Sequence, residues 1–136
     1  MAVARADAEF VREGYEAIAR GDLDMFTELA REHLDPDFEF HHVWDGTVFR
    51  GFEGTMEWLS DTRETWNDYS QEIVELVERD DLVVVVLSIS ARGGGSGVPV
   101  AQELAVVWRF AGGRAVEARS YTSRQEALAA AGVAGD

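Results

Sequence analysis

The sequence contains no cysteine, and all twelve of its basic residues are arginine, so it also contains no lysine. Without cysteine the chain can form no disulfide bond, no thiol nucleophile and no thiolate metal site. Without lysine it can form neither a Schiff base nor a covalent anchor for pyridoxal phosphate. These two absences exclude whole classes of covalent catalysis and cofactor binding.

Long hydrophobic runs are also absent. The longest apolar run, residues 82–87, is far shorter than the roughly 20 residues that span a bilayer. The first residues do not show the basic and apolar pattern of a secretory signal. The chain of 136 residues, 46% of them hydrophobic, is long enough for one domain with a real core. We therefore predict a single soluble, cytoplasmic domain over residues 1–136, with its core at about residues 7–132.

The charge is strongly one-sided, with a formal net charge of −14. Such a surface repels nucleic acids and polyanionic small molecules, and no basic stripe offsets that repulsion. A soluble acidic surface with no binding role would explain the charge equally simply. We expect no nucleic-acid or membrane partner, and a neutral or weakly charged ligand if there is one.

Apolar residues recur at helical spacing in the first half of the chain. Gly21 is placed to end the first helix, and Asp22 is placed to cap the second, which Pro36 terminates. Near the end of the chain, Ser123 and Glu126 have the spacing of a capping box. The predicted helices cover residues 7–20, 22–35, 52–66 and 124–131.

Strands are predicted where apolar and polar residues alternate and turn residues intervene. They cover residues 37–44, 69–78, 82–92, 98–110 and 114–122, while residues 46–51 and 93–97 are predicted to be loops. Because most helices precede most strands, the pattern favours an α+β domain. It predicts a curved, antiparallel or mixed sheet packed on one face against three to four helices.

Alternation assigns each strand two faces. In the last two strands the odd positions carry Glu103, Arg109, Glu117 and Arg119, so the even positions are predicted to face the helices. The strand at residues 82–92 is apolar on both faces and therefore needs a second cover. We predict that a partner chain covers the outer sheet face, giving a homodimer; the alternative is a loop or tail of the same chain.

The same even positions carry small polar groups inside the predicted core. Buried polar groups must be hydrogen-bonded or hydrated, so several of them on one face predict a cavity with convergent donors and acceptors. Alternatively, the serines pair locally with one another or with the backbone. The residues predicted to contact a ligand are Phe40, Trp44, Trp58, Ser88, Ser90, Gln102, Val106 and Ser120.

Several segments resemble those of SnoaL-like domains of the nuclear-transport-factor-2-like superfamily. The opening helix ends in Arg-Gly-Asp-Leu, and an aromatic-Arg-Gly turn leads into the third helix. The segments that carry the resemblance are residues 20–23, 34–41, 49–54, 95–98, 107–108, 113–114, 121 and 126–132.

The resemblance implies a cone-shaped α+β barrel with an internal hydrophobic cavity, and frequent dimers. Relatives with this fold include polyketide cyclases, a ketosteroid isomerase, an epoxide hydrolase and proteins without catalysis, so the fold does not decide the function. The isomerase-like and hydrolase-like members place carboxylates on the inner strand face. Here the corresponding even positions carry Ser88, Ser90 and Ser120, which cannot act as general acid or base near neutral pH.

His42 is the one titratable residue predicted on the inner strand faces, and it is the candidate general base. The resemblance to the isomerase implies that Tyr15 donates a hydrogen bond to an oxyanion, and Asp45 is placed to orient the imidazole. His41 and His42 point to opposite faces of a strand, and no HxH or HxxxH spacing occurs. We therefore predict no metal site and no cofactor.

Two classes of function are compatible with these residues. The first is a small-molecule enzyme, similar to a polyketide cyclase or an isomerase, with His42 as base. The second is a non-catalytic protein that binds an apolar metabolite or serves as a dimeric protein-interaction domain. An inner histidine favours the first class, and the lack of an inner carboxylate favours the second.

Overall fold

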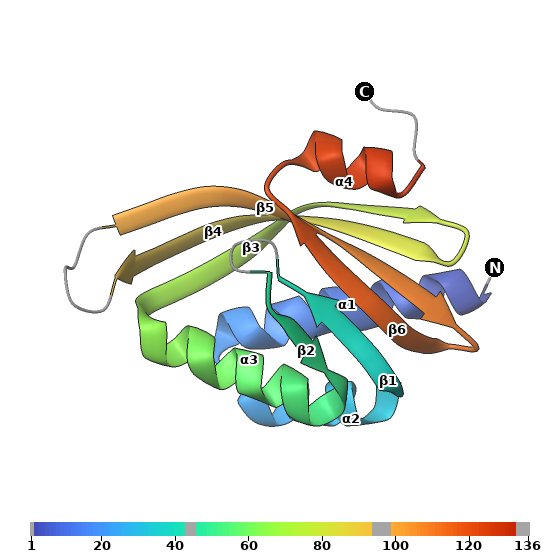
Figure 1. Cartoon of the computed structure of the whole chain (residues 1–136), viewed down its shortest axis with the longest axis horizontal. Coiled ribbons are helices and arrows are strands. Elements are labelled where there is room, and N and C mark those ends of the chain that lie inside the picture. Colours follow the sequence, from blue (N-terminus) through green and yellow to red (C-terminus); the bar gives the residue numbers. More distant parts are fainter. Residues whose placement is uncertain (1, 43–45, 94–98, 133–136) are drawn as a thin grey trace.

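The computed structural model describes residues 2–42, 46–93 and 99–132. Two helices open the chain, two strands and a third helix follow, and four strands then lead to a short last helix (Figure 1). The helices are α1 (Ala2–Arg20), α2 (Leu23–His33), α3 (Gly51–Thr65) and α4 (Arg124–Ala130). The strands are β1 (Leu34–His41), β2 (Val48–Arg50), β3 (Trp66–Arg79), β4 (Leu82–Gly93), β5 (Pro99–Ala111) and β6 (Arg114–Tyr121).

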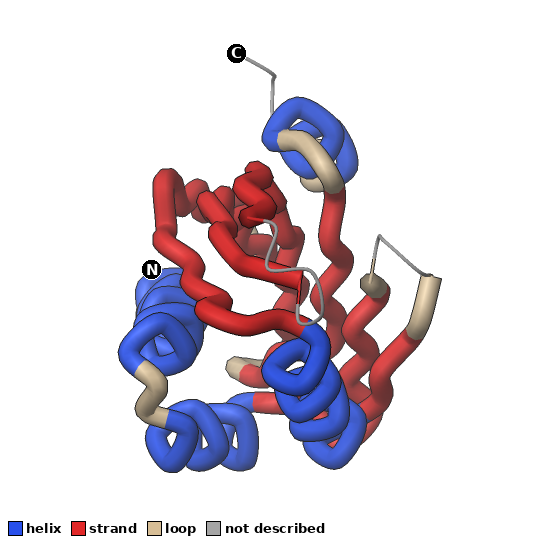
Figure 2. The backbone as a smooth tube through the Cα atoms, turned by 90° about the vertical axis from the view of Figure 1, so that its left-hand side faces the viewer, coloured by secondary structure: helices blue, strands red, loops and turns tan. Residues whose placement is uncertain are grey.

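The strands form one sheet in the order β2-β1-β6-β5-β4-β3. Strand β1 runs parallel to β6, and the other neighbouring strands are antiparallel, so the sheet is mixed. The sheet curves around the helices but does not close, because β2 and β3 form its two edges (Figure 2). The predicted α+β architecture is confirmed. Among the described residues, no helix is long and apolar enough to cross a membrane.

The predicted helix boundaries depend on local capping, and the structure confirms the caps. Gly21 has φ +76°, a conformation that favours glycine, directly after α1. The side chain of Asp22 accepts a hydrogen bond from the Met25 amide at 3.2 Å. The side chain of Ser123 likewise accepts from the Glu126 amide at 3.1 Å at the start of α4. Each cap satisfies an amide that the first turn of a helix leaves without a partner.

The main core lies between α1, α2, α3 and the inner face of the sheet. Even-numbered residues of β1 and β5, such as Phe38 and Val106, face this core as predicted. In β4, however, the odd-numbered residues face it, including Val85, which pairs with Val106. The prediction of even-numbered inner positions is therefore wrong for β4, because the register joins odd positions of β4 to even positions of β5.

A second, smaller core lies on the opposite face of the sheet. Val84, Val86 and Ala105 are buried there against Leu128 and its neighbours in α4. The prediction that all helices cover one face is therefore wrong for α4 (Figure 1). Strand β4, which is apolar on both faces, is therefore covered on its outer face by α4 of the same chain. This cover was the predicted alternative to a partner chain.

The start of the sheet also departs from the prediction. Strand β1 begins at Leu34 rather than at residue 37, and its pairing with β6 is irregular between Leu34 and Glu39. Pro36 lies in this irregular stretch, where a missing amide donor is tolerated. The short strand β2 lies in a segment predicted to be a loop, and it pairs with β1 through Phe40 and Phe49.

Candidate functional site

A cavity of about 40 Å³ lies between the three inner helices and the sheet. Helices α1, α2 and α3 and strands β1 and β5 all contribute to its wall, which is almost entirely apolar. Among the residues that the structure describes, no charged side chain lines it. Its aromatic lining residues are Phe10, Tyr15, Phe26, Phe38, Phe40, Trp58 and Trp108.

Trp108 of β5 organises the aromatic wall. Its indole Nε1 donates a hydrogen bond to the Tyr15 hydroxyl at 3.2 Å. Its ring stacks on Phe38 with a centroid separation of 5.6 Å, and Phe10 meets it edge-on at 5.8 Å. These contacts come from a helix and two strands, so the shape of this wall depends on all three elements.

Among the described residues that line the cavity, four carry a polar side-chain atom, namely Tyr15, Thr55, Trp58 and Trp108. Tyr15 lines it from α1 and receives the hydrogen bond from Trp108. Thr55 lines it from α3, and its hydroxyl donates to the backbone oxygen of Gly51 at 2.9 Å. Tyr15 therefore lies at the cavity, and its role as an oxyanion donor stays a prediction.

His42 lies just beyond the cavity rather than in its wall. The side chain is half-buried, and its ring meets Phe40 edge-on at 5.8 Å and Phe49 at 6.5 Å. Its backbone is fixed by hydrogen bonds with Thr47 and Gly46. Phe40 lines the cavity, so the imidazole is separated from it by one aromatic ring. The predicted partner of His42, Asp45, lies outside the described residues.

The other residues predicted to contact a ligand fall into four groups. Phe40 and Trp58 line the cavity, and their rings meet edge-on at 5.4 Å. Val106 and Ser120 face the inner side of the sheet but are buried in packing, and the Ser120 hydroxyl donates to the His41 backbone oxygen at 3.3 Å. Trp44 lies outside the described residues.

The remaining three predicted contacts are exposed. Ser88 and Ser90 lie on the outer face of the sheet, opposite the face predicted. The reason is that even-numbered residues of β4 face outward, as the pairing of Ser88 with Glu103 shows. Gln102 lies on the same, inner face of β5 as Leu104, but it is exposed near the start of the strand. None of these three side chains lines the cavity.

Sequence reasoning missed several residues of the wall. Phe10 and Ile18 of α1 belong to the apolar stripe that predicted the helix, and Phe26 belongs to that of α2. Trp108 stands at a predicted inner position of its strand. The helical spacing identified these residues as core, but it did not distinguish a core position from a cavity wall.

A second hollow of about 300 Å³ lies between α1 and β3, and it is more polar. Tyr15 lines both hollows. Gln71 of β3 is 6% exposed, and its amide nitrogen donates to the backbone oxygen of Tyr15 at 3.2 Å. Gln71 therefore ties the middle of α1 to the sheet at the boundary between the two hollows.

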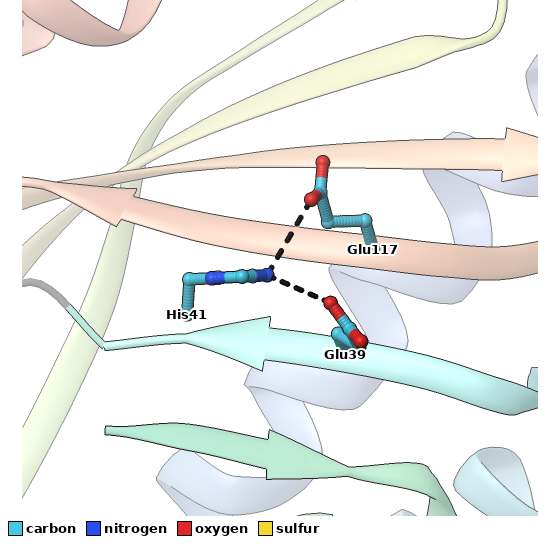
Figure 3. A group of neighbouring side chains, drawn as sticks. All are labelled: Glu39, His41 and Glu117. Carbon is cyan, nitrogen blue, oxygen red and sulfur yellow. Dashed lines mark hydrogen bonds and ion pairs between the residues drawn. The ribbon is translucent and has the colours of Figure 1, made fainter. Parts of the chain in front are cut away.

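On the outer face of the sheet, three side chains capable of binding a metal converge. They are Glu39 and His41 of β1 and Glu117 of β6 (Figure 3). Hydrogen bonds from His41 and Arg50 hold the pKa of the Glu39 carboxyl below its ordinary value. Within the described residues, this is the group of His, Asp and Glu side chains whose ligand atoms lie close enough together for one ion.

Parts of this chain are similar to known proteins in sequence and in fold. The model of the SnoaL-like domain family matches residues 11–118. A search of the curated proteins finds no match.

Three solved structures are similar in fold. A protein with a ketosteroid isomerase-like fold from Catenulispora acidiphila, solved with trimethylamine, is 18% identical, with a TM-score of 0.72 over 93% of this chain and 94% of that chain. TerC, co-crystallised with polyporic acid, is 18% identical, with a TM-score of 0.71 over 87% and 92%. IdmH, a candidate polyketide cyclase from Streptomyces antibioticus, is 25% identical, with a TM-score of 0.68 over 92% and 97%.

Proposed function

The chain belongs to the SnoaL-like domain family, and we propose that it binds a small, largely apolar molecule in the cavity beneath α1, α2 and α3. The observation that carries this proposal is the composition of the wall. Aromatic rings surround a few hydrogen-bonding groups, chiefly the hydroxyls of Tyr15 and Thr55. Sites for small organic ligands combine apolar enclosure with a few oriented polar groups in this way.

The size of the cavity limits how a ligand can bind. At about 40 Å³, it is much smaller than the roughly 150 Å³ engineered cavity that accepts benzene. A ring-sized ligand therefore enters only if side chains of the wall move. The complexes of the Catenulispora protein with trimethylamine and of TerC with polyporic acid support a small organic ligand.

A substitution that fills the cavity tests this proposal without removing any contact. Gly14 lines the cavity, and a Cβ built there meets nothing within 4 Å. Gly14→Met should occupy the space and abolish binding. The measurement is quenching of tryptophan fluorescence by trimethylamine, by polyporic acid and by the neutral dye Nile red, because Trp58 and Trp108 both line the cavity.

The matched control places the same side chain one position along the helix. Glu13 is exposed, so Glu13→Met should bind each probe as the wild type does. Equal binding by Gly14→Met and wild type would contradict the cavity as the site. Absence of binding by the wild type to all three probes, and of a co-purified ligand in native mass spectrometry, would favour the protein-interaction alternative.

A catalytic role is the second candidate, with His42 as general base and Tyr15 as the oxyanion donor. It is favoured by the hydrogen bond from Trp108 to the Tyr15 oxygen, since a hydroxyl that accepts a hydrogen bond becomes a stronger donor. His42 lies one ring away, beside Phe40. Movement of Phe40 on ligand binding would bring the imidazole to the cavity.

Kinetics with a substrate found by screening enolisable and cyclising apolar compounds tests this role. His42→Gln should lower kcat by about 10²–10⁴-fold while the fluorescence titration still shows ligand binding. Unchanged kcat in this variant would exclude His42 as the base and leave the binding proposal intact.

A homodimer through the outer sheet face remains part of the proposal. Helix α4 covers the β4 and β5 half of that face, so the β1 and β6 half is the available surface. This half is charged, and a self-complementary contact on it would lie beside the Glu39, His41 and Glu117 cluster. Light scattering after size exclusion should give a dimer mass at micromolar concentration; a monomer mass would refute the contact.

A further inference from the structure

The cluster of Glu39, His41 and Glu117 (Figure 3) lies on the face of the sheet opposite to Phe38 and Phe40, which line the cavity. Glu39 and His41 are two residues apart on β1, so their side chains share a face. Glu117 stands beside Glu39 on the neighbouring parallel strand. Two adjacent central strands therefore position the three side chains.

Two of the distances between donor atoms match those around a bound ion. The His41 Nε2 atom lies 3.1 Å from Glu39 Oε1 and 3.5 Å from Glu117 Oε2. Two ligand atoms on one tetrahedral zinc ion, each bonded at about 2.0–2.2 Å, are about 3.3 Å apart. The ligand atoms of all three residues lie within 4.8 Å of one another, so small side-chain rotations can place them around one ion.

Arginines hold the outer oxygens of both carboxylates. Arg50 pairs with Glu39 Oε2, the oxygen that does not face His41. Arg109 donates to Glu117 Oε1 at 2.6 Å and leaves Oε2 directed toward His41. Hydrogen bonds of this kind orient the carboxylate ligands of metal sites.

One arginine competes with an ion. Arg119 donates to Glu117 Oε2 at 3.3 Å, the oxygen that faces His41. Its side chain is 45% exposed, so it can turn into solvent, and exposed ion pairs contribute little to stability. The net charge of −14 of the whole chain raises the local concentration of cations.

We propose that Glu39, His41 and Glu117 bind one zinc ion, with a fourth position open to water. One imidazole and two carboxylates suit Zn²⁺ or a similar transition metal, whereas Mg²⁺ prefers oxygen ligands alone. The spacing of the histidines in the sequence had predicted no metal site. Glu117 is distant in sequence and joins the cluster only through the pairing of β1 with β6.

Isothermal titration of the metal-free protein with ZnCl₂ tests the site. We expect one zinc per chain for the wild type, with an affinity at least about tenfold weaker for His41→Ala and for Glu117→Gln. Glu117→Gln preserves the shape of the side chain, so the test does not depend on how His41→Ala folds. Titration with CoCl₂ should add visible d–d absorption, and MgCl₂ in excess should not displace zinc.

The control is the neighbouring histidine. His42 points to the other face of the sheet, so His42→Gln should bind zinc as the wild type does. Arg119→Met should bind more tightly, because it frees Glu117 Oε2 and removes a positive charge. Failure of the wild type to bind zinc, or zinc binding by His41→Ala and Glu117→Gln as tight as that of the wild type, would show that the cluster is an ion-pair network only.

Discussion

The two faces of strand β1 show how differently one short segment can serve a protein. Phe38 and Phe40 point inward and belong to the aromatic wall of the cavity, while Glu39 and His41 point outward into a network of charges. Adjacent residues are thus divided between an apolar environment and a hydrated one. The sheet separates the proposed ligand site from the proposed zinc site, and side-chain alternation alone accomplishes this.

The outer face itself has two halves. Over β4 and β5 it is apolar and covered by α4, through Val84, Val86 and Leu128. Over β1 and β6 it is charged and carries no helix of the described chain. A charged surface is stable in contact with water, whereas a large apolar surface is not. Helix α4 therefore covers the half of the face that needs burial.

The largest effect is expected from breaking the inner face of β1. Phe38 is 1% exposed and stacks on Trp108. Phe38→Ala should lower the free energy of unfolding by about 3–5 kcal/mol, because it leaves a cavity and removes ring contacts. Urea denaturation measures this value. Glu39→Gln, one residue away on the outer face, should change it far less, and similar losses for both would contradict the two-face description.

Removing the apolar anchor of α4 should have the next largest effect. Leu128 is 1% exposed and packs on Val84 and Val86. Leu128→Ala should cost about 2–5 kcal/mol of unfolding free energy, measured by the same denaturation experiment. Gln125 is an exposed residue of the same helix, so Gln125→Ala should be close to neutral. A neutral Leu128→Ala would mean that α4 is not the cover of this face.

Substitutions at two glycines allow the space at the cavity to be compared with that at a tightly packed site. A Cβ at Gly54 would lie 2.9 Å from the Phe49 backbone carbon, whereas a Cβ at Gly14 meets nothing within 4 Å. Gly54→Ala should destabilise the protein by about 1–3 kcal/mol through overpacking. Gly14→Ala should stabilise it by about 0.5–1 kcal/mol, because alanine favours the helix interior. Thermal melts measure both shifts, and equal signs would contradict the space at Gly14.

The smallest effect concerns the ion pair that ties α4 to β3. Arg124 donates to both carboxylate oxygens of Glu75, at 2.6 and 3.1 Å, and these hydrogen bonds hold the pKa of Glu75 below its ordinary value of 4.5. The ionised carboxylate is therefore the stabilised form. Its contribution is present above about pH 4.5 and is lost as the pH falls through the lowered pKa.

Glu75→Gln should thus cost less than about 1 kcal/mol near neutral pH, since both side chains are partly exposed. The difference from the wild type should disappear at lower pH. Denaturation curves at several pH values check this, and a difference that grows on acidification would have the wrong sign.

Local features of the fold were predictable from the sequence. The caps at Asp22 and Ser123 and the left-handed glycine after α1 depend on residues within one turn of each other. The apolar stripe of α1 includes Tyr15, which the resemblance to the isomerase singled out, and alternation in β1 placed Phe40 on the inner face. The short strand β2 was missed, because three residues beside a loop show too little periodicity to predict a strand.

Register was not predictable, and it caused the principal error. Within one strand, the backbone geometry makes alternate residues face the same side of the sheet. After each turn, however, either the even-numbered or the odd-numbered residues can face inward. Val85 faces Val106 across β4 and β5, so odd positions of one strand share a face with even positions of the other. This offset moved Ser88 and Ser90 from the predicted cavity to the outer face, although the apolar residues of β4 were correctly expected to be buried.

The class of fold, the caps, and the separation of apolar from charged positions within each strand follow from the amino-acid order, because they depend on short-range sterics and periodicity. Four features depend on the packed fold: which faces meet, the cover of the outer side by α4, the contact of Trp108 with Tyr15, and the joining of Glu117 to Glu39 and His41. Those contacts join residues far apart in the chain, and their geometry depends on register and packing, which local sequence does not specify.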